Sequence, residues 1–371
     1  MGDVREEQYP PEWMERVKKL GRVFIYNRVM WLSWSGTGIE WECEGGFTLK
    51  LKADEIPFDR EDAGVHMARY ALFCDGALKI DDRLDSAEKV IRISSEGVHT
   101  YRFIKLSESA DSSLGITELS DRYGGCEGLS PVADKKLKIE VIGDSITCGY
   151  GVEGNLEQTY STATENVTRS YSYIVPARLN ADYSIVSKSG AGIISGYTDN
   201  GVRNGFNILT EYYDKMGCSV FQTGDAWPSD FDYDYSFEPD IIIVNLGTND
   251  MSYCSPADPA VRAKYTDNEL LGRQKEFCGL YKKFIEHLRE NNPFAKIVCT
   301  LGIMGEALNS IVEMVVSMQI AEGDRRIFWL PLKDQDPENG YGVDYHPSEK
   351  TQALLADTVA DFVEKVLRKE V

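Results

Sequence analysis

Three short motifs combine side chains that can carry out nucleophilic catalysis. Gly-Asp-Ser-Ile-Thr contains Ser145, whose hydroxyl is a weak nucleophile until a base removes its proton. Asp-Tyr-His-Pro-Ser contains His346, and histidine is the side chain most often used as such a base near neutral pH. Gly-Thr-Asn-Asp contains Asn249, whose amide can donate a hydrogen bond to an oxyanion. Together the motifs predict acyl transfer through a serine nucleophile.

Each motif also has an ordinary structural explanation when it is taken alone. Gly, Asn and Asp favour turns, and a serine in a turn often caps a helix. The first motif is not the GxSxG nucleophile elbow, because position 147 is threonine. The remaining histidines, His66, His99 and His287, have no comparable sequence context. The hypothesis therefore depends on the three motifs occurring together at the ends of predicted elements.

The elements predicted around these motifs place them at one edge of a sheet. Ser145 and Asn249 each follow an apolar run that is typical of a buried strand, and His346 precedes an amphipathic helix. The expected strands are 137–142, 183–187, 241–244, 297–301 and 327–330, and the expected helices are 170–179, 207–216, 268–290, one between the last two strands, and 355–367. This alternation predicts a parallel sheet covered by helices on both faces, with ligands at the carboxyl ends of its strands.

The first third of the chain has a different pattern. Apolar and polar residues alternate at 39–43 and 47–51, with further short candidate strands at 69–74, 89–93 and 98–106, and turn residues between them. Repeated short strands favour a small β-sandwich. We therefore expect two domains, a β-sandwich over 1–130 that begins with a short helix, and an α/β domain over 137–371.

Charge and cysteine usage exclude several classes of partner and site. The net charge of −20 argues against binding to nucleic acid or anionic membranes, and no apolar run approaches the ~20 residues of a membrane span. The N-terminal residues show no secretory signal, so we expect a cytoplasmic protein. The eight cysteines form no CxxC pair or Cys/His cluster in the sequence, so reduced thiols, no metal and no cofactor are expected. The oligomeric state stays open.

The motifs, with one further block, resemble those of a known superfamily. Gly143–Ser145, Ser189–Gly192, Gly247–Asp250 and His346-Pro347 are similar in type and order to the four blocks of the SGNH (GDSL-type) hydrolases. The resemblance implies a three-layer SGNH-type fold over about 137–371. It also implies that Ser145 is the nucleophile and His346 its base. The oxyanion hole would consist of the Ser145 and Gly190 N–H groups and the Asn249 amide.

A closer resemblance is to carbohydrate esterase family 2, in which a small jelly-roll-like β domain precedes the SGNH domain. It is carried by stretches such as 143–154 (GDSITCGYGVEG), 239–250 (PDIIIVNLGTND) and 299–304 (CTLGIM), together with the β-rich front of the chain. The resemblance implies removal of O-acetyl groups from glucomannan, mannan or xylan, or from their oligosaccharides. Two other hypotheses are an SGNH lipase or thioesterase, and a glycan-binding protein without catalysis.

Two parts of the site are less defined by the sequence. Many SGNH enzymes have an aspartate three residues before the histidine, but position 343 is valine, and Asp344 lies two residues before His346. Asp344 would orient His346 through its side chain, or only a backbone carbonyl would do so, leaving a Ser–His dyad. An aromatic sugar platform is expected from Trp227, Tyr253, Tyr341 and Tyr345, although ordinary packing also explains each ring. Asp144 and Asp250 are expected to support their loops.

Overall fold

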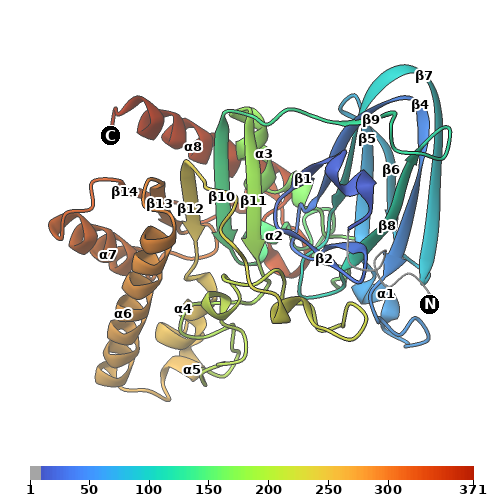
Figure 1. Ribbon diagram of the computed structural model, residues 1–371. Helices are drawn as coiled ribbons and strands as arrows, with labels where there is room; N and C mark the ends of the chain where they lie inside the picture. The colour runs from blue at the N-terminus through green and yellow to red at the C-terminus, as the bar shows by residue number, and fades with distance from the viewer. Residues whose placement is uncertain (1–9) are drawn as a thin grey trace, which may run out of the picture. The chain divides into compact units, whose positions relative to one another are not determined.

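The computed structural model describes residues 10–371, which form two compact units (Figure 1). The first unit contains the described residues up to Lys135 together with Tyr160–Glu165 and Lys215–Tyr233. The second contains Lys136–Thr159, Asn166–Asp214 and Asp234–Val371. Two short segments of the expected range 137–371 therefore pack with the front of the chain, which local patterns do not reveal.

A five-stranded parallel sheet forms the centre of the second unit. Its order is β11-β10-β12-β13-β14. The first of these five strands along the chain, β10, therefore lies inside the sheet between β11 and β12. The strands are β10 (Leu137–Gly143), β11 (Ala181–Ser187), β12 (Ile241–Asn245), β13 (Lys296–Leu301) and β14 (Ile327–Pro331). Every residue of β12 is buried, as expected for a strand covered on both faces. The predicted α/β alternation is confirmed.

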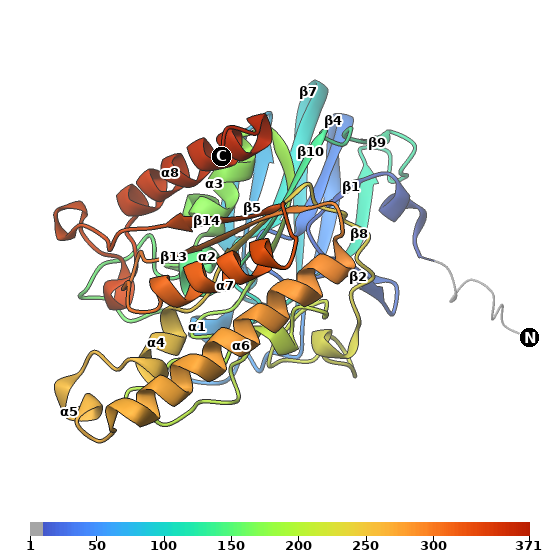
Figure 2. The same cartoon turned by 90° about the vertical axis from the view of Figure 1, so that its left-hand side faces the viewer.

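Helices cover both faces of this sheet and make three layers. Figure 2 shows α3 (Tyr171–Arg178) and α8 (Glu349–Arg368) on one side of the sheet, with α6 (Asp267–Asn291) and α7 (Asn309–Ala321) on the other. The short helices α2 (Ser145–Cys148), α4 (Thr248–Cys254) and α5 (Pro259–Arg262) follow strands or lie in loops. The apolar stripe of α8, from Leu355 to Val366, is buried against the sheet.

The helix expected at 207–216 is wrong. Only one turn of 3₁₀-helix forms there, at Leu209–Glu211. The reason is that this backbone bonds to another segment: Gly192 N–H donates to the Asn207 carbonyl at 3.1 Å, and Leu209 N–H donates to the Gly192 carbonyl at 2.9 Å. These bonds use groups that an α-helix would need for its own turns.

Antiparallel strands make up the first unit. Among the described residues they form a nine-stranded sheet with the path β2-β3-β8-β4-β7-β5-β6, and β1 and β9 also pair with β4. The strands are β1 (Lys18–Leu20), β2 (Val23–Tyr26), β3 (Val29–Leu32), β4 (Gly38–Ala53), β5 (Arg69–Cys74), β6 (Ala77–Arg83), β7 (Glu88–Lys105), β8 (Leu114–Asp121) and β9 (Leu129–Pro131). The sheet curls around one apolar core, so the expected β domain in front of an SGNH-type sheet is confirmed.

Several local expectations in this unit need correction. The alternating runs 39–43 and 47–51 belong to one long strand, because Glu44–Gly46 is a β-bulge in β4 and not a turn. The runs 89–93 and 98–106 likewise join in β7. The short N-terminal helix is reduced to one 3₁₀ turn at Glu12–Glu15, and the first nine residues lie outside the described part. A four-residue helix, α1 (Ala63–His66), precedes β5.

In the described part of the chain, no helix combines the length and the apolar composition needed to cross a bilayer.

Candidate active site

A cavity of about 880 Å³ lies in the second unit, among loops that follow the parallel strands. Its lining includes Ser145 after β10, Gly190 after β11, Asn249 after β12 and His346 before α8. These four residues therefore line one cavity, although they are separated by up to about two hundred positions in the sequence. This is the edge at which the carboxyl ends of parallel strands bind ligands.

Ser145 is the first residue of the short helix α2, directly after β10. Its predecessor Asp144 is the N-cap residue, and the Asp144 carboxylate accepts a hydrogen bond from the Ile146 N–H at 3.1 Å. Burial raises the pKa of Asp144 to about 7, and the neighbouring charge of Asp250 adds to that rise. Asp144 therefore holds the turn that carries Ser145, in a support role that the sequence predicted.

Asn249 is the second residue of α4, the helix after β12, and it lines the cavity. The Nδ2 group donates to the Ala191 carbonyl at 2.9 Å and approaches the Asp144 carboxylate at 3.4 Å. The first bond fixes the side chain, and the second is long for an N–H···O bond. Because the amide nitrogen carries two hydrogens, one N–H can serve an oxyanion while the other keeps the Ala191 bond.

Gly190 lies on a loop that Asp250 organises. The buried Asp250 carboxylate accepts bonds from the N–H groups of three consecutive residues, Ile193, Ile194 and Ser195, at 2.7–3.1 Å. Burial raises the pKa of Asp250 to about 6, and these N–H donors oppose that rise. A Cβ at Gly192 would lie 2.7 Å from the carboxylate, so this position requires glycine.

His346 has the hydrogen-bonding pattern of a general base. Its Nδ1 lies 3.1 Å from the Val343 carbonyl, and a carbonyl oxygen can only accept, so Nδ1 carries the proton. The neutral ring then has Nε2 available to accept a proton. Desolvation lowers the pKa of His346, while the Val343 carbonyl and the charge of Asp344 oppose the shift. The ring is thus kept neutral near neutral pH.

Asp344 lines the cavity but does not take the place of a triad aspartate in this geometry. Its carboxylate accepts a hydrogen bond from the Tyr150 hydroxyl at 2.9 Å, and the Tyr150 ring packs on the His346 ring with centroids 4.3 Å apart. The acceptor for Nδ1 comes instead from the backbone of Val343, the position at which many SGNH enzymes have aspartate. The geometry favours the dyad alternative.

The aromatic residues expected at the substrate site have different surroundings. Tyr345 lines the cavity, is 63% exposed, and packs edge-on against Tyr341. Tyr253 is not among the described residues that line the cavity, and the Arg273 guanidinium lies over its ring, 4.1 Å from the centroid. Trp227 belongs to the first unit, where it precedes a 3₁₀ turn and is 45% exposed. A role for Trp227 in substrate binding stays a prediction.

Two cavity residues were not selected from the sequence. Tyr150 lies between two glycines five residues after Ser145, and this Gly-Tyr-Gly stretch in the same motif was the signal available for it. Tyr197 is 61% exposed at the cavity and follows the Asp250-supported loop. No local pattern marks Tyr197, since its position depends on how that loop folds.

Comparison with protein families decides the relationship. The family model described as "GDSL-like Lipase/Acylhydrolase family" matches residues 141–354, which include all four blocks. The chain belongs to this family. The matched range contains the loops that carry Ser145, Gly190, Asn249 and His346, so these loops lie within the family's domain.

Individual relatives refine this placement. The chain is 32% identical over 290 residues to "Cellulase/esterase CelE" of Acetivibrio thermocellus. The aligned region covers 76% of this chain and 32% of CelE, so this chain spans about a third of that relative. It is 25% identical over 293 residues to an "Acetylxylan esterase / glucomannan deacetylase" of Cellvibrio japonicus, covering 78% and 73% of the two chains. The structure of a family two carbohydrate esterase from Clostridium thermocellum shares the fold, with a TM-score of 0.78, 24% identity, and coverage of 95% and 99%.

Proposed function

We propose that this protein is a carbohydrate O-acetyl esterase that works through a Ser–His dyad. The observation that carries the proposal is that Ser145, Gly190, Asn249 and His346 line one cavity, while the Nδ1 of His346 is bonded to a backbone carbonyl. This arrangement supplies a nucleophile, a base of defined tautomer and donors for an oxyanion. Membership of the acylhydrolase family supports an ester as the substrate.

The first half-reaction forms an acetyl-enzyme. His346 Nε2 takes the proton of Ser145 as the hydroxyl oxygen attacks the acetyl carbonyl carbon. The oxyanion that forms is stabilised by the N–H groups of Ser145 and Gly190 and by the Asn249 amide. When the tetrahedral intermediate collapses, His346 returns the proton to the departing sugar oxygen, so the sugar leaves as an alcohol.

The second half-reaction releases acetate. Water enters, His346 removes its proton, and the resulting hydroxide attacks the acetyl carbon of the Ser145 ester. Collapse of the second tetrahedral intermediate breaks the bond to Ser145, and His346 gives the proton back to the serine oxygen. Apart from the substrate and one water molecule, the proposed cycle uses side chains and backbone groups of this chain.

Acetylated glucomannan, mannan or xylan, or their oligosaccharides, are the proposed substrates. The Cellvibrio japonicus relative is named as an acetylxylan esterase and glucomannan deacetylase, which supports this class of substrate. The cavity itself offers exposed tyrosine rings, Tyr197 and Tyr345, and an exposed carboxylate at Asp199. Rings can pack on the apolar face of a sugar, and carboxylates accept bonds from its hydroxyls. A cytoplasmic location stays a prediction.

Acetate release tests the proposal directly. Wild type and Ser145→Ala are incubated with acetylated glucomannan, acetylated manno-oligosaccharides and acetylxylan, and acetate is measured. We expect release by wild type and a fall of at least about 10³-fold in Ser145→Ala, because no other group replaces the nucleophile. The matched control is Ser310→Ala on the exposed surface of α7, which should retain full activity.

Three results would contradict the proposal in different ways. A Ser145→Ala enzyme that keeps a tenth of the activity would exclude the serine mechanism. If none of the three substrates releases acetate but long-chain acyl esters are hydrolysed, the lipase or thioesterase hypothesis is favoured instead. Binding of the glycans without hydrolysis would favour a binding protein.

A further inference from the structure

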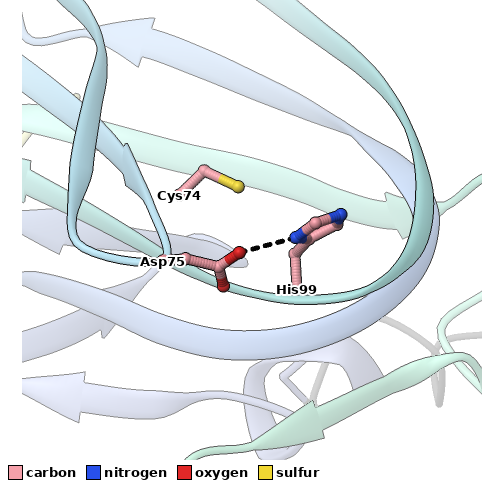
Figure 3. Close-up of side chains that lie close together, drawn as sticks. All are labelled: Cys74, Asp75 and His99. Carbon is pink, nitrogen blue, oxygen red and sulfur yellow. Dashed lines mark hydrogen bonds and ion pairs between the residues drawn. The ribbon is translucent and has the colours of Figure 1, made fainter.

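A cluster of three potential metal ligands lies in the first unit, in which the mechanism above uses no residue. Cys74 ends β5, Asp75 follows it in the turn to β6, and His99 lies on β7. The sulfur, a carboxylate oxygen and a ring nitrogen of these residues all lie within 4.8 Å of one another. Figure 3 shows the three side chains gathered on the same side of the hairpin.

The backbone of the β5–β6 hairpin fixes two of these side chains. Cys74 pairs with Ala77, so the loop contains only Asp75 and Gly76, with φ angles of 49° and 79°. An Asp-Gly loop with two positive φ angles is the preferred two-residue hairpin connection. Cys74 and Asp75 are therefore held next to β7 by the turn itself, before any ligand is considered.

The outer hydrogen bonds of a metal site are already formed. The Nε2 of His99 donates to the Glu96 carbonyl at 2.8 Å, which leaves Nδ1 directed toward Asp75, and the Thr100 N–H donates to Asp75 Oδ1 at 3.0 Å. Metal-bound histidines commonly donate their second N–H to a carbonyl, and metal-bound carboxylates are in turn hydrogen-bonded. These two bonds would orient the ligands without changing when a metal binds.

A hydrogen bond joins two of these three side chains. Asp75 Oδ2 lies 2.7 Å from His99 Nδ1, and because both ring nitrogens of His99 face acceptors, the ring is an imidazolium. A divalent cation would displace this Nδ1 proton and the Cys74 thiol proton, releasing two protons for one ion.

We propose that Cys74, Asp75 and His99 bind a Zn²⁺ ion through Sγ, a carboxylate oxygen and Nδ1. One sulfur, one imidazole nitrogen and one carboxylate oxygen form a donor set that suits zinc, while Mg²⁺ and Ca²⁺ prefer oxygen ligands only. Three protein ligands leave a fourth tetrahedral position for water. The ion would tie the β5–β6 turn to β7. The sequence predicted no metal site, because Cys74 and His99 are twenty-five positions apart.

The alternative is an Asp75–His99 ion pair in which the Cys74 thiol takes no part. A measurement of metal binding distinguishes these two hypotheses. The full chain is freed of metal with a chelator, kept reduced with a phosphine, and titrated with Zn²⁺ and with Co²⁺. We expect one Zn²⁺ per chain and, with Co²⁺, a near-ultraviolet thiolate-to-cobalt charge-transfer band. Affinity should fall as pH falls, because both displaced protons then compete with the metal.

Three ligand variants locate the site. Cys74→Ser, Asp75→Asn and His99→Gln should each weaken Zn²⁺ binding by at least about tenfold, since even outer-sphere partners change metal affinity by roughly 10–100-fold. Asp75→Asn is the sharpest, because asparagine tolerates a positive φ and keeps the hairpin turn. The matched control is Cys278→Ser, a half-buried thiol on α6, which should bind Zn²⁺ and Co²⁺ as wild type does.

The outcomes are decisive in both directions. Equal thermal stability of the metal-free variants and wild type shows that the variants fold, so a loss of binding then supports the site. The proposed site would be overturned if Cys74→Ser and Asp75→Asn bound Zn²⁺ as tightly as the wild type does. It would also be overturned if the wild type bound no stoichiometric Zn²⁺. None of these readouts uses esterase activity, so the result is independent of the proposed function.

Discussion

At the scale of single residues, the orientation of His346 depends on a backbone atom. Val343 stands where many SGNH enzymes have aspartate, and its side chain cannot accept a hydrogen bond. Its carbonyl does so instead, at 3.1 Å from Nδ1. The turn that allows this has positive φ at both Asp344 and Tyr345, 51° and 61°, an uncommon conformation for non-glycine residues. The tautomer of the base is thus fixed by loop conformation.

Asp344→Ala tests this assignment. We expect kcat/KM to fall by less than about tenfold, whereas loss of a triad aspartate costs on the order of 10⁴. The wild-type profile of kcat/KM should fall as pH falls through the His346 pKa, which desolvation lowers below 6.5. Because the Asp344 charge opposes that lowering, its removal should move the acidic limb to still lower pH. Steady-state kinetics from pH 4 to 8 on an acetylated oligosaccharide measure both effects.

Tyr150→Phe is the matched variant for this test. It removes the hydroxyl that donates to Asp344 and keeps the ring that packs on His346. Its activity should therefore resemble that of Asp344→Ala. A loss near 10⁴-fold in Asp344→Ala, with normal activity in Tyr150→Phe, would instead establish Asp344 as the group that orients His346.

At the scale of elements, the site depends on loops that join strands to helices. The loop after β11 that carries Gly190 is held by Asp250 of α4, which accepts hydrogen bonds from three of the loop's N–H groups. The geometry of Gly190 is consequently coupled to a side chain sixty residues away in the sequence. This coupling predicts that a change at Asp250 affects both stability and catalysis.

Asp250→Asn isolates that coupling. The amide can keep the oxygen in the place of Oδ1, which accepts from all three N–H groups. It puts an NH₂ donor in the place of Oδ2, where it faces the Ile193 N–H, and it removes the negative charge toward which the three N–H groups point. We expect destabilisation of about 1–3 kcal/mol and a fall in kcat that exceeds the change in KM, because the oxyanion donors move. Urea unfolding and steady-state kinetics provide the two measurements.

The control for this variant is Asp361→Asn on the exposed face of α8, where the aspartate pairs with Arg178. Its stability should change by no more than about 0.5 kcal/mol, as is usual for surface positions. An Asp250→Asn enzyme as stable and active as this control would show that the loop does not need the carboxylate.

At the scale of the whole molecule, the net charge of −20 acts on every substrate that approaches. Repulsion of anionic substrates is screened by salt, with a Debye length of about 10 Å at 0.1 M. Acetylated xylo-oligosaccharides that carry glucuronic acid should therefore show kcat/KM rising about twofold or more between roughly 0.02 and 0.5 M NaCl, a range over which the Debye length shortens about fivefold. Neutral acetylated manno-oligosaccharides should show no such rise. An equal salt response of both substrates would contradict the electrostatic explanation.

The sequence by itself determined the α/β alternation and where the candidate catalytic residues stand relative to the strands and helices. Ser145 and Asn249 follow predicted strands and His346 precedes a predicted helix, and the apolar periodicity of these elements is local. Their meeting at one edge was therefore expected, because the carboxyl ends of parallel strands lie at the same edge of a sheet. The β-rich front of the chain was equally readable, although the bulge in β4 was taken for a turn, since both use glycines. The 207–216 segment was misread because its backbone partners lie in another loop.

Only the tertiary structure decided which atoms complete each site. The Val343 carbonyl, the Tyr150–Asp344 bond and the three N–H donors to Asp250 join segments far apart in the chain, and backbone atoms have no sequence signal. The same holds for Cys74 and His99, which were scattered residues until β5 paired with β7. Local patterns fix elements because those depend on near neighbours, whereas contacts between elements depend on how the whole chain packs.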